Sequence, residues 1–119
     1  MKGSSLIGAF ALVATLFLAA PWVVAAEQGI KTDDDLVAAI KANTPEKHQE
    51  IAAWYKAKAG EEKKMAEEHR KMSTAYVGSK AAYADQMHKH CDQLVSLHEK
   101  LAAQYAKLAV EHEAAAGKK

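Results

Sequence analysis

Apolar and polar residues are arranged in two different patterns along the chain. Leu6 to Ala20 is an almost unbroken apolar run, LIGAFALVATLFLAA, whereas from residue 33 onward apolar residues recur at spacings of three and four. Such spacings place the apolar side chains on one face of a helix. The second pattern predicts an all-helical domain, with helices over about residues 33–42, 45–76 and 80–116.

The expected helix boundaries rest on capping residues. Thr32 precedes three aspartates, and Thr44 precedes Pro45. A threonine followed by acidic residues or by proline is typical of a helix start. Gly78 interrupts the helical pattern, and Ser79 is expected to cap the last helix. The stretch VGSK, residues 77–80, is so short that the two long helices should form an antiparallel hairpin.

Steps of three and four residues along each long helix define a seam, the row of residues that faces the other helix in a coiled coil. The expected first seam is His48, Ile51, Tyr55, Lys58, Glu62, Met65, His69, Met72 and Tyr76. The expected second seam is Ala84, Met87, Cys91, Leu94, His98, Leu101, Tyr105, Leu108 and His112. With Tyr76 opposite Lys80, Met65 is expected to face Cys91. Because two helices bury only a thin core, we expect two hairpins to dimerise into a four-helix bundle.

The N-terminal segment has the features of a secretory signal peptide. Lys2 precedes the apolar run, and the small residues Val24 and Ala26 follow it. The run is shorter than the ~20 residues that span a bilayer. We expect residues 1–26 to be cleaved, which leaves residues 27–119 as one periplasmic or secreted helical-hairpin domain with no membrane segment.

The charge of that domain argues against a nucleic-acid partner. Removal of Lys2 leaves 15 basic and 15 acidic residues, so the net charge is zero. A nucleic-acid-binding protein normally has a basic stripe. The abundance of alanine, lysine and glutamate is instead typical of a coiled coil or a long helix.

Soft metal ligands are concentrated near the turn of the expected hairpin. The stretch MHKHCDQLVSLHEK, residues 87–100, contains three of the six histidines and the only cysteine. The expected register brings five side chains into adjoining layers: Met65, His69, Met72, Met87 and Cys91. Thioether, thiolate and imidazole groups together select Cu(I). Zinc is the alternative, although it usually takes four cysteine or histidine ligands.

Three further histidines complete the candidate metal site. His88 and His90 flank the seam, where they could add a ligand or pass the metal in from the surface. His98 lies on the seam with Glu62, which could orient it as a ligand or form a buried hydrogen bond with it. Haem is disfavoured because the chain has no CxxCH attachment motif. The pattern predicts Cu(I) buffering, delivery or sensing, with another protein as metal donor or acceptor.

A second interpretation needs no metal. Methionine is common core filler, and polar seam residues often select a partner helix, so the hairpin could be a structural or interaction protein. Catalysis is not expected, because a helical hairpin offers no evident substrate pocket for a Cys91 nucleophile. His48 and His112 lie at the open ends of the helices, where solvent exposure is expected.

Overall fold

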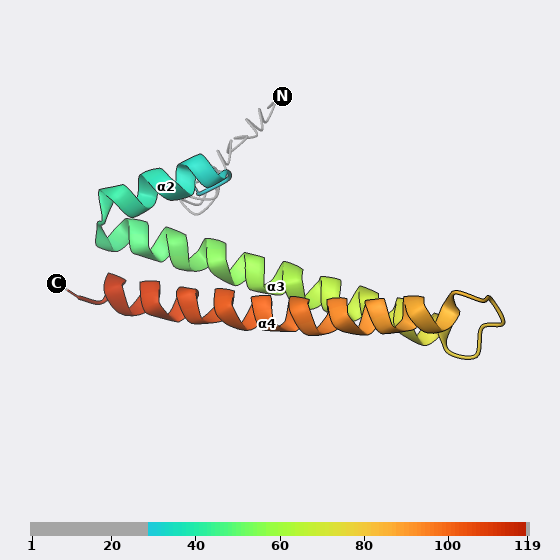
Figure 1. Cartoon of the computed structure of the whole chain (residues 1–119). Coiled ribbons are helices and arrows are strands. Elements are labelled where there is room, and N and C mark those ends of the chain that lie inside the picture. The colour runs from blue at the N-terminus through green and yellow to red at the C-terminus, as the bar shows by residue number, and fades with distance from the viewer. Residues whose placement is uncertain (1–28, 119) are drawn as a thin grey trace, which may run out of the picture.

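The computed structural model describes residues 29–118 and contains three α-helices (Figure 1). They are α2 (Asp33–Ala42), α3 (Pro45–Tyr76) and α4 (Ala84–Ala116). α3 and α4 lie side by side and antiparallel, and α2 folds back against the first turns of α3. The expected all-helical hairpin is confirmed over this range, within which no strand occurs. The expected signal peptide, residues 1–26, lies outside the described residues.

Capping interactions explain where the first two helices begin. The Thr32 hydroxyl accepts a hydrogen bond from the Asp35 amide (3.1 Å), and the Asp35 carboxylate accepts one from the Thr32 amide (3.0 Å). This reciprocal pair is a capping box. The Thr44 hydroxyl accepts from the Lys47 amide (3.2 Å), with Pro45 in the first turn. Between the two helices Asn43 takes the left-handed conformation, with φ 51°.

The turn of the hairpin is longer than expected, because α4 begins at Ala84 and not at residue 80. Gly78 has a φ of 77°, a left-handed conformation that a glycine adopts without steric cost. The Ser79 hydroxyl accepts from the Ala81 amide (3.4 Å), a local bond that takes the place of the expected helix cap. Tyr83 precedes α4 without a side-chain cap. The connection therefore spans residues 77–83.

Small residues form the tightest part of the interface between α3 and α4. The buried side chains at seven-residue intervals in α3 are Ala52, Ala59, Ala66 and Ser73. The buried small side chains of α4 are Ala84, Cys91, Ala102 and Ala109. Ile51 is the only large side chain that is fully buried among residues 29–118. Because alanine projects one methyl group, the two backbones can approach more closely than a methionine or leucine seam would allow.

The expected seam was therefore wrong at several alternate positions, although Ile51, which is one of them, is fully buried. Residues such as Tyr55, Glu62 and His69 do lie between the helices, but Ala59, Ala66 and Ser73 take the places assigned to Lys58, Met65 and Met72. Met65 and Met72 are instead 39% and 48% exposed. The large apolar residues of α4 are displaced in the same way, since Leu94 and Leu101 are also exposed.

The hairpin consequently has two unlike edges. One carries Met65, Met72, Met87, Leu94 and Leu101, and we call it the apolar edge. The other carries the ion pairs Arg70–Glu99 and Lys56–Glu113, which join α3 to α4. Exposed ion pairs of this kind contribute little stability but favour contact with water. Within residues 29–118, no helix is both long and apolar enough to span a membrane.

Candidate metal centre

Cross-helix contacts fix the register of the hairpin. Tyr55 stacks on Tyr105 with 5.8 Å between ring centroids. The Glu62 carboxylate lies 2.5 Å from Nδ1 of His98. The expected register placed Leu101 and Leu94 opposite these two α3 residues. The observed partners lie four positions later in α4, because the longer turn delays the helix by one turn.

The corrected register changes the neighbours of the candidate ligands. Glu62 faces His98, and the two helices are antiparallel. Seven residues after Glu62 in α3 is His69, and seven residues before His98 in α4 is Cys91, so His69 and Cys91 lie in one layer of the interface. The expected pairs Met65–Cys91 and His69–Met87 are therefore wrong. Met72 follows His69 by three residues and Met87 precedes Cys91 by four, which places both thioethers beside this layer on the apolar edge. We call His69, Met72, Met87 and Cys91 the central cluster.

His69 and Cys91 supply the buried candidate ligand atoms of the central cluster. Nδ1 of His69 is buried and has no hydrogen-bond partner among the described residues. The Cys91 thiol is buried and free of any disulfide in the structure. An unpaired buried nitrogen costs about 1–3 kcal/mol. This layer thus combines an imidazole nitrogen that lacks a partner with the only thiol of the chain.

The neighbouring layer holds His98, which is already engaged. Its Nδ1 contacts Glu62, and the side chains of both residues are about four-fifths hidden from solvent. Its ring stacks on His69, with 5.3 Å between centroids and 9° between planes. Two imidazoles stacked face to face do not direct their nitrogens at one point between them. His98 therefore supports the position of His69 and does not share a ligand site with it.

Of the two remaining candidate histidines, His88 is already hydrogen-bonded and His90 is exposed. Nδ1 of His88 is 2.7 Å from the Ser73 hydroxyl and 3.1 Å from the Ser73 carbonyl oxygen. Its Nε2 is 3.4 Å from Asp92, whose carboxylate also accepts from Ser73. These contacts occupy both ring nitrogens of His88. His90 is exposed on the surface of α4.

The described residues offer no metal site built from charged and imidazole ligands alone. Within residues 29–118, no three side chains of histidine, cysteine, aspartate or glutamate are grouped so that they could hold an ion. A zinc centre of the usual closed kind is thus unsupported. An ion at the central cluster would need thioether ligands, which favour Cu(I).

A second polar constellation lies at the open end of the hairpin, where we expected solvent-exposed histidines. Nδ1 of His48 is 2.9 Å from Nδ1 of His112, and Nε2 of His48 is 2.7 Å from Oδ1 of Asn43. The His112 ring also stacks on Tyr55. Burial, followed by the nearby His48 ring, lowers the pKa of His112, so its imidazole is neutral at pH 7. The signal was present in the sequence, because both histidines occupy seam positions.

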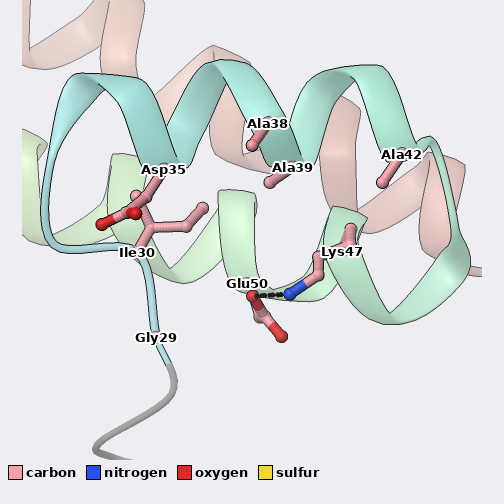
Figure 2. Close-up of a pocket in the computed structure, with 8 residues that line it drawn as sticks. All are labelled: Gly29, Ile30, Asp35, Ala38, Ala39, Ala42, Lys47 and Glu50. Carbon is pink, nitrogen blue, oxygen red and sulfur yellow. Dashed lines mark hydrogen bonds and ion pairs between the residues drawn. The ribbon is translucent and has the colours of Figure 1, made fainter.

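The groove between α2 and α3 is lined by no histidine, cysteine or methionine of residues 29–118 (Figure 2). Ile30 and the alanines of α2 line one side, and the ion pair between Lys47 and Glu50 lines the other (2.8 Å). The Asp35 carboxylate at its end is used in the capping box. The groove is explained by helix packing.

Comparison with known proteins does not assign a function to these histidines, methionines and Cys91. No protein-family model, curated protein or solved structure matches the chain.

Proposed function

We propose that the protein binds Cu(I) at the central cluster and serves in buffering, delivery or sensing of the metal outside the cytoplasm. The observation that carries the proposal is the buried, unpartnered Nδ1 of His69 in the layer of Cys91. Met72 and Met87 lie beside that layer and supply soft thioether sulfur. Imidazole, thiolate and thioether form a ligand set that selects Cu(I) over harder ions.

The chemistry of binding is ligand exchange coupled to loss of a proton. The Cys91 thiol must give up its proton to bind the ion and the His69 nitrogen must present a lone pair, whereas thioethers carry no proton. Affinity therefore falls in acid. Met72 is 48% exposed, which offers an entry route for Cu(I) from a donor protein. The exposed His90 lies one residue before Cys91 and is a second surface group near that route.

An anaerobic Cu(I) titration against a competing chromogenic chelator tests the proposal. We expect one equivalent of Cu(I) per chain, and we expect Cys91→Ala and His69→Gln to weaken binding. Gln93→Ala is the control, because Gln93 is exposed on α4 only two residues from Cys91 and faces away from α3. Failure of the wild-type protein to compete with the chelator would refute copper binding. Equal loss in Gln93→Ala would show that the central cluster does not hold the ion.

The apolar edge favours a second candidate, an interaction protein whose partner is another copy of itself. Ile51 occupies the equivalent position in the first turns of α3, where α2 packs, and it is fully buried. Beyond α2 the same edge is uncovered, and Leu97, at 59% exposure, widens it. Two copies related by a two-fold axis would cover each other's apolar edge and form a four-helix bundle.

Sedimentation of the protein over a range of concentrations tests this dimer. The paired substitution Leu94→Glu and Leu101→Glu places charge on the apolar edge and should yield a monomer. Gln93→Glu adds charge on the exposed surface of the same helix and should leave the dimer intact. A wild-type chain that stays monomeric at high concentration would refute the dimer. A dimer that forms without copper binding would leave the interaction role as the function.

A further inference from the structure

The histidine pair at the open end, His48 and His112, joins the two ends of the hairpin. His48 lies in the first turn of α3 and His112 in the last turns of α4, 64 residues apart in sequence. Their δ nitrogens face each other at 2.9 Å, and Asn43 anchors His48 to the end of α2. All three described helices therefore meet at this point.

The hydrogen-bond partners determine where the protons lie. Oδ1 of Asn43 can only accept, so Nε2 of His48 carries the proton and donates it. One of the two facing δ nitrogens must accept, so Nδ1 of His48 presents its lone pair and Nδ1–H of His112 donates to it. A ring N–H that donates to a carbonyl oxygen is the usual support of a histidine metal ligand. Asn43 thus orients His48 with a free lone pair toward His112.

The separation of the two nitrogens suits adjacent ligands of one ion. Metal–imidazole bonds of about 2.0–2.1 Å at a right angle place the two nitrogens about 2.9 Å apart. The hydrogen bond already holds the nitrogens 2.9 Å apart, so the two rings need to turn toward an ion but not to separate. Square-planar and octahedral ions such as Cu(II) and Ni(II) prefer that right angle and bind imidazole well.

We propose that His48 and His112 form a site for a divalent, imidazole-preferring transition-metal ion, separate from the central cluster. Binding moves the His112 proton from Nδ1 to Nε2, so both δ nitrogens present lone pairs and no net proton is lost. Two waters leave the hydrated ion, and its other positions keep water. The bound ion clamps the C-terminal turns of α4 to the start of α3 and, through Asn43, to α2.

Ni(II) is the probe, because it favours right-angle sites and does not oxidise the thiol. Thermal unfolding of the full chain is followed by circular dichroism with and without Ni(II), in the wild type and in Cys91→Ala. We expect Ni(II) to raise the midpoint in both proteins, because an ion that binds only the folded state stabilises it. Loss of the shift in Cys91→Ala would place the ion at the central cluster and overturn the proposal.

A second experiment substitutes each histidine of the pair in turn. Affinity for Ni(II), measured by calorimetry at a temperature where each variant is folded, should fall by more than about tenfold in His48→Gln and in His112→Gln. His90→Gln, which removes an exposed histidine of α4, is the control and should bind as the wild type does. Unchanged affinity in either variant of the pair would overturn the proposal. Paramagnetic broadening of the Asn43 and His112 amide signals by Ni(II) in the wild-type protein would locate the ion, and this measurement does not depend on how well the variants fold.

Discussion

The alanine seam leads to a prediction about two adjacent residues of α3. Met65 is 39% exposed on the apolar edge, whereas Ala66 is 3% exposed between the helices. We propose to place the same side chain at each position, as Met65→Gln and as Ala66→Gln. The two variants then differ only in where the glutamine lies relative to α4.

The expected costs follow from burial. About three-fifths of Met65 is hidden, and full burial of a methionine contributes about 1.5–3 kcal/mol, so Met65→Gln should cost about 1 kcal/mol. Ala66→Gln forces extra atoms between closely packed helices, at about 1–3 kcal/mol. It also buries an amide without partners, at about 1–3 kcal/mol. The second variant should thus lose about 2–6 kcal/mol, a large part of the stability of a small domain.

Urea unfolding followed by circular dichroism at 222 nm measures both costs. The midpoint should fall slightly in Met65→Gln, with an unchanged slope. In Ala66→Gln it should fall by several times as much, or helix should be lost without urea. If Met65→Gln were the more damaging variant, Met65 would lie in the seam and the register described above would be wrong.

Three further predictions concern single interactions. Gly60→Ala should raise the free energy of unfolding by about 1 kcal/mol, because a methyl group there meets no atom within 4 Å. Gly78→Ala should lower the free energy of unfolding, because Gly78 has a φ of 77°. Urea titrations that show the same stability for both variants would contradict this prediction. A double-mutant cycle of Glu62→Gln and His98→Gln should show coupling of about 1 kcal/mol, and additive effects would mean that the 2.5 Å contact does not stabilise the fold. Hydrogen bonds from backbone amides lower the pKa of Asp35 below 3.8, so its contribution to stability is complete above that pH and is lost as the pH falls through its folded pKa; an NMR titration midpoint at or above 3.8 would refute the capping box.

The helices could be predicted from sequence because their signals are local. Thr32 and Thr44 cap the helices that they were expected to cap, and Gly78 lies in the turn. The extra turn residues could not be predicted, because the Ser79 hydroxyl can cap a helix or accept from the Ala81 amide with similar geometry. The error shifted every cross-helix pair by four residues.

The second error concerned which side chains lie between the helices. The expected seams followed steps of three and four residues, which led through Met65 and Leu94. The chain instead buries alanines such as Ala59 and Ala66, and it places Met65 on the edge. A broad apolar stripe contains both sets at helical spacing, and periodicity alone cannot rank them. His48 and His112 both lie on the expected seams, so only the four-residue error in register hid their pairing.

An interface made of single methyl groups leaves the two helices free to slide along their common axis. A displacement of seven residues, about 10 Å, would put each small residue of α3 in the place of the next one. It would, however, place Glu62 beside Tyr105 or Cys91 and would separate His48 from His112. The polar contacts therefore specify the register: burial of apolar surface brings the helices together, and a few hydrogen bonds determine how they are aligned along their common axis.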